Sequence, residues 1–286
     1  MSGTDWLYGP WSPLAPTCSS SNMAFELLTT INEPPPDENG NGIPDACEAP
    51  PAIAVDPLGE KNRFISFTVP AAAVASAAGP TALRVKPMSL HHVQPPYTGG
   101  PSVPFTSFEF GVSCAEAGGC VRWVGPPTQF IESNAIPTPF YASGLQCAPY
   151  YQDWSTIGLL HVTGSAIAPS SVYEVENVSV ICTGFESSCV AVSAPQTVAT
   201  RRWGDVEIPY NPPSATQQPD TADISALVAK FRSSQGAPIK ARSFLTGDDA
   251  FGNITSLNVD FGFSHIAACV DAFRGKPYPF AIQSCP

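Results

Sequence analysis

Charged residues are scarce in this chain of 286 residues, and basic ones are the rarer kind. Only 13% of the residues are Asp, Glu, Lys or Arg, against about 25% in an average soluble domain. The 13 Lys and Arg residues stand against 24 Asp and Glu residues, which gives a formal net charge of -11. Nucleic acids and anionic lipid surfaces select basic proteins, so neither is an expected partner.

The sequence also lacks long apolar runs and zinc-binding patterns. No run of about 18 apolar residues occurs, so no membrane span is expected. The nine cysteines include no Cys-x-x-Cys pair, which argues against zinc. Close pairs such as Cys114 with Cys120 and Cys182 with Cys189 indicate disulfides instead, and hence an oxidising, extracellular location. Residues 1–11 lack the blocks of a signal peptide, so export implies a preceding leader or a different gene start.

Patterns of known catalytic sites are missing as well. There is no Gly-x-Ser-x-Gly, no His-Glu-x-x-His and no phosphate loop. His91-His92 has no carboxylates at ligand spacing, and His161 lies in an apolar segment, where a hydrogen-bonded sheet residue is expected. A glycosidase needs two converging carboxylates, whereas Glu109, Glu132 and Asp153 are scattered. The chain is therefore expected not to be an enzyme.

Apolar residues and proline are abundant. Hydrophobic residues make up 43% of the chain, too many for a disordered polypeptide, while 32 Pro and 22 Gly residues limit helix. Several short segments alternate apolar and polar residues between turns, which is typical of strands. These segments predict a mainly β protein, a β-sandwich of Ig-like or jelly-roll type. The expected strands are residues 65–69, 83–85, 108–112, 121–124, 157–162, 172–181 and 190–198.

Composition divides the chain into four parts. Residues 1–36 form an aromatic and proline-rich arm with a candidate helix at residues 23–31. Residues 37–51 form an acidic loop between proline clusters. Residues 52–200 form the sandwich, and residues 201–286 form a small helical module.

The acidic loop carries the strongest site signal. Residues 37–48, Asp-Glu-Asn-Gly-Asn-Gly-Ile-Pro-Asp-Ala-Cys-Glu, match the twelve-residue calcium-loop pattern, in which alternate residues offer oxygens and a glycine permits a sharp turn. The triple proline before it leaves no room for an EF-hand helix, and with Cys47 near its end the loop resembles a single thrombospondin type 3 repeat. That resemblance implies calcium; the other interpretation is a solvated linker. The expected ligands are Asp37, Asn39, Asn41, the carbonyl of Ile43, Asp45 and Glu48.

The last 80 residues contain an internal repeat. Residues 223–232 align without a gap on residues 265–274. Each copy places apolar residues at i, i+3, i+4 and i+7, which predicts two amphipathic helices whose apolar stripes pack together. Asp220 and Ser264 are the expected N-cap residues. The stripes are Ile224, Leu227, Val228 and Phe231 in the first copy, and Ile266, Cys269, Val270 and Phe273 in the second.

This repeat resembles a dockerin-type module, which pairs two units of calcium loop and helix. Gly204-Asp205-Val206 is similar to that family's loop opening, and Asp220 with Asp223-Ile224 is similar to its loop end and helix start. Residues 270–280 resemble the ending of dockerin-like tails in large secreted bacterial proteins. The resemblance implies an extracellular location and a second calcium ion at Asp205, Asp220 and Asp223, and it names no activity. The plain alternative for these acids is helix capping.

Three further groups are candidate contact or modification sites. Flat aromatic rings can stack on sugars, which makes one aromatic cluster a candidate glycan platform; its alternative is a buried corner of the sandwich. The aromatic arm needs burial, on the sandwich or on a neighbouring molecule. Two Asn-x-Ser/Thr sequences match glycosylation acceptors. The residues are Tyr150, Tyr151 and Trp154 for the glycan platform, Trp6, Tyr8 and Trp11 for self-association, and Asn177 and Asn253 for glycosylation.

These features predict a non-enzymatic, extracellular, calcium-stabilised structural protein that self-associates into a filament or surface layer. An arm or edge strand that adds to the next subunit gives a head-to-tail contact, and such contacts propagate. The expected partner is therefore another copy of the chain. The alternative is a secreted carbohydrate-binding or scaffold-attachment module with a polysaccharide partner.

Overall fold

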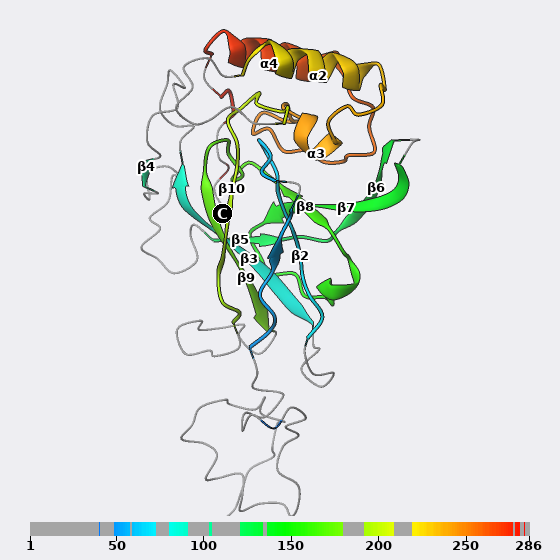
Figure 1. The fold of residues 1–286 in the computed structure, drawn as a ribbon. Coiled ribbons are helices and arrows are strands. Elements are labelled where there is room, and N and C mark those ends of the chain that lie inside the picture. Colours follow the sequence, from blue (N-terminus) through cyan, green and yellow to red (C-terminus); the bar gives the residue numbers. More distant parts are fainter. Residues whose placement is uncertain are drawn as a thin grey trace, which may run out of the picture.

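The computed structural model describes residues 40, 49–57, 59–72, 80–90, 103–104, 121–133, 136–179, 192–208, 219–276, 278–280 and 283. These residues form a large curled sheet with helices across one end (Figure 1). Several predictions lie outside the described residues. They are the helix at 23–31, the strand at 108–112, the calcium ligands at 37–48 and the aromatic residues of the arm, Trp6, Tyr8 and Trp11.

The described strands belong to one hydrogen-bonded sheet. Their order is β1-β2-β8-β7-β5-β3-β9-β10, with β4 paired to β3 and β6 paired to β7. Among these pairs only β7 and β8 run parallel. The strands are β1 (Ala54–Val55), β2 (Ile65–Thr68), β3 (Thr81–Leu90), β4 (Val103–Pro104), β5 (Arg122–Val124), β6 (Thr128–Ser133), β7 (Ile136–Gln146), β8 (Leu160–Thr163), β9 (Val172–Ser179) and β10 (Gln196–Ala199).

The two ends of this sheet approach each other and nearly close it. A parallel bridge joins Lys61 to Thr200, and the Arg201 N–H donates to the Lys61 carbonyl at 2.8 Å. The prediction of a mainly β fold is confirmed. The finer prediction of two stacked sheets is not confirmed, because the described strands form one continuous path from β1 to β10.

The main core lies inside the curled sheet and follows the predicted alternation. Ile65 and Phe67 of β2 and Leu83 and Val85 of β3 are almost fully buried there. The residues between them point to the other face, where Arg84 pairs with a carboxylate of β9. Removing apolar surface from water drives this arrangement, so the period of two places one face of each strand inward.

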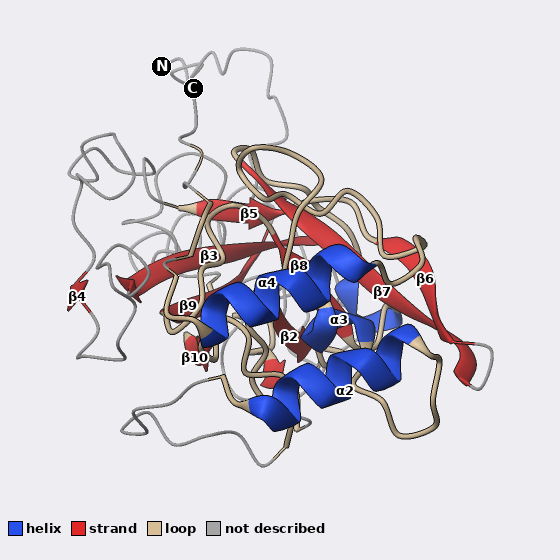
Figure 2. Ribbon diagram, turned by 90° about the horizontal axis from the view of Figure 1, so that it is seen from above, coloured by secondary structure: helices blue, strands red, loops and turns tan. Residues whose placement is uncertain are grey.

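A helical layer covers one end of the sheet. It consists of α2 (Thr221–Phe231), the short α3 (Lys240–Ser243) and α4 (Phe263–Phe273). Seen from above, α2 and α4 lie side by side over the sheet (Figure 2). Leu227 of α2 and Cys269 of α4 share one buried cluster, so the two predicted helices and their packing are confirmed. A 3-10 turn, Trp154–Thr156, precedes β8.

Two details of the helix prediction are wrong. The N-cap of α4 is Gly262, not Ser264, because the helix begins at Phe263 and places Ser264 in its first turn. The last apolar residue of each predicted stripe is also exposed: 53% of Phe231 and 45% of Phe273 is accessible. Asp220, by contrast, is the N-cap of α2, where its side chain accepts from the Ala222 N–H at 2.6 Å.

The helical layer and the sheet share a second core. On the sheet, this core contains Phe64, which precedes β2, and Phe130 of β6. They pack against Phe244 and Leu257, which lie between α3 and α4. The helical layer is therefore attached to the sheet by buried apolar side chains. No helix in the described ranges is long and apolar enough to cross a membrane.

Candidate functional site

The acids predicted for a second calcium site do lie near one another, and Asp223 has the central position. Its Oδ1 accepts from the backbone N–H groups of Val206 at 2.7 Å and Glu207 at 2.9 Å, and its Oδ2 accepts from the Asp220 N–H at 2.9 Å. Burial raises the pKa of Asp223, and these three hydrogen bonds oppose that shift. Asp223 thus ties the segment after Gly204 to the start of α2.

The described geometry leaves the second calcium site untested. Within the described ranges, no three His, Cys, Asp or Glu side chains are arranged to hold a metal ion. Asp220 caps α2, and both oxygens of Asp223 accept backbone N–H groups. Each carboxylate oxygen has a second lone pair, so these hydrogen bonds do not decide whether an ion binds, and the site at Asp205, Asp220 and Asp223 stays a prediction.

The charges of the same acids act on a buried thiol. Cys269 of α4 is a free cysteine with no exposed surface. Burial raises the pKa of this thiol, and the charges of Asp223, Asp205 and Asp220 raise it further. The thiol is therefore protonated at neutral pH and has the packing role of a small apolar residue. Cys147, in contrast, is disulfide-bonded.

The second copy of the repeat uses His265 where the first uses Asp223. The His265 Nδ1 accepts from the backbone N–H groups of Leu245 at 3.2 Å and Thr246 at 3.3 Å. Its ring stacks on Phe261, with the centroids 4.9 Å apart. Burial lowers the pKa of His265 to about 4, and Arg63 lowers it as well. Each copy therefore ties a preceding segment to its helix through one side-chain acceptor, an acid in the first and a neutral imidazole in the second.

The predicted glycan platform is largely buried. Trp154 is 1% exposed, and its Nε1–H donates to the Thr81 carbonyl at 2.7 Å. Tyr150 packs edge-on against it with ring centroids 6.1 Å apart, and Tyr151 beside it is half-buried. Trp154 offers no face to a sugar in this structure, and the cluster has the geometry of a buried aromatic corner.

The two predicted glycosylation acceptors differ in exposure, and both side chains hold structural hydrogen bonds. Asn177 on β9 is 1% exposed, and its Nδ2 donates to the Pro51 carbonyl at 3.1 Å. A glycan there is incompatible with the fold, because the amide lies inside it. Asn253 is half-buried; it accepts from the Ser165 N–H at 2.8 Å and donates to Asp249 at 2.9 Å.

A Ser–His pair lies on the adjacent strands β2 and β8, where the two residues are opposite each other. Ser66 Oγ and His161 Nδ1 are 2.7 Å apart, and both residues are buried. Burial lowers the pKa of His161 to about 3, and the charge of Lys61 lowers it as well. An imidazole with this pKa is a poor general base at neutral pH, since efficient bases titrate near the working pH. His161 is a hydrogen-bonded sheet residue, as the sequence predicts.

A pocket of about 330 Å³ opens where the ends of the sheet separate, between β2 and β10. Its lining includes Val55, Ile65 and Val198, and also Lys61 and Asp56. The Lys61 Nζ donates to Asp56 Oδ2 at 2.7 Å and to the Gly59 carbonyl at 2.8 Å. Both charged side chains are 1% exposed. These hydrogen bonds lie within the segment between β1 and β2, so the ion pair orders that segment beside the pocket.

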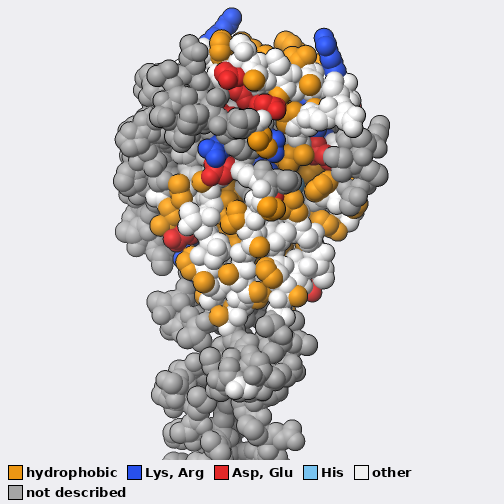
Figure 3. All heavy atoms as spheres, viewed as in Figure 1, with side chains coloured by type: hydrophobic (Ala, Val, Ile, Leu, Met, Phe, Trp, Pro, Cys, Tyr) orange, Lys and Arg blue, Asp and Glu red, His pale blue; other side chains and the backbone are white. Residues whose placement is uncertain are grey.

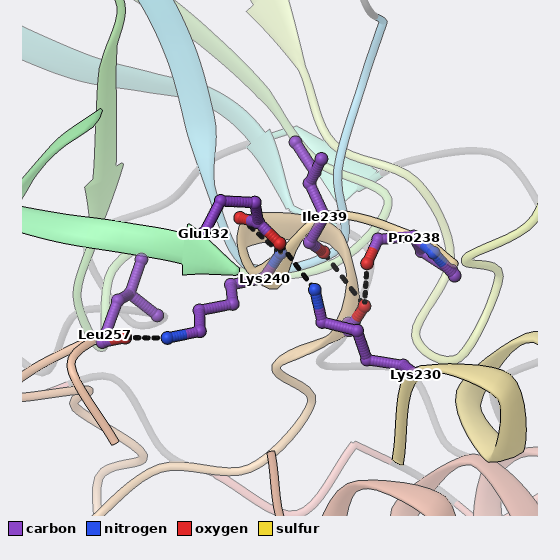
Figure 4. Close-up of polar contacts among 7 residues, drawn as sticks. Glu132, Lys230, Pro238, Ile239, Lys240 and Leu257 are labelled. Atoms are coloured by element: carbon purple, nitrogen blue, oxygen red, sulfur yellow. Dashed lines mark hydrogen bonds and ion pairs between the residues drawn. The ribbon is translucent and has the colours of Figure 1, made fainter. Parts of the chain in front are cut away.

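Glu132 joins three elements in a polar cluster that sequence reasoning did not detect (Figure 4). On β6, it accepts from the Lys230 ammonium of α2 and from the backbone N–H of Lys240, at the start of α3, at 2.8 and 2.9 Å. The Lys240 Nζ in turn donates to the Leu257 carbonyl at 2.7 Å. The side chains of Glu132 and Lys230 are 4% and 10% exposed. Because Glu132 is about one hundred residues away from Lys230 and Lys240 in sequence, only the fold could reveal this cluster.

The helical layer exposes aromatic residues to solvent. Phe231 ends α2, Phe263 begins α4 and Phe273 ends α4, and their exposed fractions are 53%, 67% and 45%. The space-filling view shows hydrophobic side chains at this end of the molecule, together with basic and acidic ones (Figure 3). We call this surface, defined by Phe231, Phe263 and Phe273, the helical face.

Comparison of the chain with protein-family models, with curated proteins and with solved structures finds no match.

Proposed function

We propose that the chain is a non-enzymatic, extracellular structural protein that self-associates, with calcium bound at residues 37–48. The Ig-like or jelly-roll class and the dockerin-like nature of residues 201–286 remain part of this proposal. The calcium site rests on the sequence of that loop alone. The charge of -11 and the disulfide at Cys147 agree with a secreted protein.

The exposed helical face is the observation that carries the proposal. Exposed apolar side chains that collect on one layer of a fold mark a candidate interaction site. Phenylalanine is also enriched at protein interfaces relative to the rest of the surface. Two of the three aromatic residues, Phe231 and Phe273, occupy the same place in the two copies of the repeat. Exposure of this pair is thus repeated in the two halves of the helical layer. The repetition favours a function in binding another molecule.

The polar groups of the described residues support a structural role. His161 and His265 are buried and neutral, and each is used in a hydrogen bond within the fold. Glu132 and Asp223 each hold separate segments together. The alternative of a carbohydrate-binding module is weakened, because Trp154, the largest ring of its predicted platform, is buried.

Negative-stain electron microscopy of the full chain in calcium tests this function. We expect ordered assemblies in the wild type and monomers after deletion of residues 1–17, while the deleted protein keeps the melting temperature of the fold. Assemblies that persist after the deletion would exclude a role of Trp6, Tyr8 and Trp11. A wild type that shows only single particles at every concentration would contradict self-association itself.

A further inference from the structure

The helical face combines apolar and basic character. Arg232 follows Phe231 at the end of α2, and Arg274 follows Phe273 at the end of α4; both arginines are exposed. The space-filling view shows basic side chains at two corners of this end, with hydrophobic atoms between them (Figure 3). The nearby Lys276 is paired with Asp271 at 2.8 Å. Two equivalent Phe-Arg pairs therefore stand at opposite ends of the layer.

The N-terminal part of the chain has the complementary chemistry. Residues 1–48 contain no Lys or Arg, and they carry the aromatic residues Trp6, Tyr8 and Trp11. A chain with so few charges concentrates its acids here. The acidic residues of this segment outside the proposed calcium ligands are Asp5, Glu26, Glu33 and Glu38.

This segment joins the fold at the end opposite to the helical face. The described chain continues from residue 49 into β1 at the end of the sheet that lies away from the helical layer (Figure 1). The complementary surface and the segment are thus attached to opposite ends of the molecule. A contact between such ends in neighbouring copies is heterologous, and it propagates as an open chain unless the rotation closes a ring.

We propose that the helical face binds residues 1–48 of a second copy of this chain. Aromatic side chains of the segment pack on Phe231, Phe263 and Phe273, and its carboxylates pair with Arg232 and Arg274. This inference rests on the proposed self-association and names the two surfaces that meet. The exposed charge pairs are screened by salt, so the affinity falls as the ionic strength rises.

Two double variants of the full chain test the proposal, and both change only exposed side chains. Phe263→Ser with Phe273→Ser removes apolar contact, and Arg232→Glu with Arg274→Glu reverses charge. We expect each to raise the protein concentration needed for half-assembly at least tenfold, at an unchanged melting temperature. Met88→Ser is the matched control, because Met88 is a 46% exposed apolar residue of β3 away from the helices; it should change neither quantity.

A direct binding measurement separates this inference from the proposed function. The probe is a fluorescent synthetic peptide of residues 1–48 with Cys18 and Cys47 replaced by Ser, titrated with the full chain and followed by anisotropy. Binding that both double variants weaken at least tenfold supports the inference. Assemblies that form equally well in the variants would overturn it and leave self-association standing. A monomeric wild type would overturn both, and so would a segment that binds only the face of its own molecule.

Discussion

At the scale of single residues, the two copies of the C-terminal repeat solve the same problem with different acceptors. Backbone N–H groups that precede each helix need partners, since buried polar groups without them are costly. Asp223 supplies a carboxylate in the first copy, and His265 supplies Nδ1 in the second. With His265 in place of an aspartate, the second copy has no negative charge at this position. It therefore has no carboxylate there that could bind a cation.

The buried imidazole makes the stability of the fold depend on pH. The pKa of His265 is about 4 in the folded protein and about 6.5 in an unfolded chain. Between these values the unfolded state binds the additional proton, so stability present above pH 6.5 is lost as the pH falls toward 4. His265→Asn keeps an acceptor near Nδ1 and cannot titrate. We expect the loss of unfolding free energy between pH 7.5 and pH 4.5 to shrink by about 2–3 kcal/mol in this variant.

Urea unfolding at a series of pH values measures this difference. Asp223 shifts in the opposite direction, since its pKa is raised, but it is present in both proteins and cancels in the comparison. Ser264→Ala, on the same helix, is the control and should keep the wild-type pH profile. Parallel profiles for wild type and His265→Asn would show that His265 does not carry the effect.

At the scale of elements, the N-terminal residues of α2 and α4 lead to a prediction about helix capping. Asp220 caps α2 and also takes part in a capping box with Asp223, whereas Ser264 lies inside the first turn of α4. Loss of an N-cap side chain costs about 1 kcal/mol. Asp220→Ala should therefore lower the unfolding free energy by about 1 kcal/mol, and Ser264→Ala should change it by less than about 0.5 kcal/mol. Denaturant melts measure both, and equal losses would contradict the capping assignment.

The strands show where sequence patterns succeed and where they fail. Ile65 and Phe67 alternate with polar neighbours, and their strand was predictable. Strand β7 was not predicted, because Pro137 and Pro139 suggest that no strand forms there. The pairing explains the exception: this half of β7 pairs with β6 alone, while β8 joins only from Tyr141 onward. Proline is tolerated where a strand has a hydrogen-bonded neighbour on one side only, because proline has no N–H to donate. The sequence does not show which strands are neighbours in the sheet.

The Glu132 cluster links elements in a way that can be measured. Its carboxylate is buried between the Lys230 ammonium and the first N–H of α3. Breaking a buried ion pair typically costs several kcal/mol, because it leaves an uncompensated charge. Glu132→Gln should therefore lower the unfolding free energy by about 3 kcal/mol. Hydrogen exchange should also show faster opening of α3.

An exposed ion pair of the same layer provides the control for this variant. Asp271 and Lys276 are 2.8 Å apart, with side chains 38% and 58% exposed. Surface pairs contribute little, so Asp271→Asn should cost less than about 0.5 kcal/mol. Similar small losses in both variants would contradict the proposed role of Glu132 as the link between sheet and helices.

At the scale of the whole molecule, charge is distributed unevenly along the chain. Residues 1–48 carry acids and no basic residue, and the predicted calcium loop lies among them.

Calcium binding at residues 37–48 leads to a prediction about stability. If the loop binds calcium only in the folded protein, binding stabilises the fold by about 2.7 kcal/mol when the calcium concentration is one hundred times the dissociation constant. A chelator should lower the melting temperature of the wild type and leave Asp37→Ala unchanged. A chelator effect that remains in Asp37→Ala would call for the same test on Asp205, Asp220 and Asp223, the predicted second site. An unaffected wild type would contradict both sites.

The organisation of the molecule was only partly predictable from the sequence. The repeat placed both helices, because its apolar spacing is local. Their attachment to the sheet depends on contacts such as Phe130 with Phe244 and on the Glu132 cluster, which join residues far apart in the chain. The exposure of Phe231 and Phe273 was not predicted either, since an apolar stripe suggests burial along its whole length.

Sedimentation velocity of the full chain in calcium, over a wide range of protein concentration, tests self-association most directly. We predict species larger than the monomer whose fraction grows with concentration and falls as salt is added, because the contact is partly electrostatic. A single monomeric species at every concentration and salt would contradict the proposal that this protein is a self-associating structural unit.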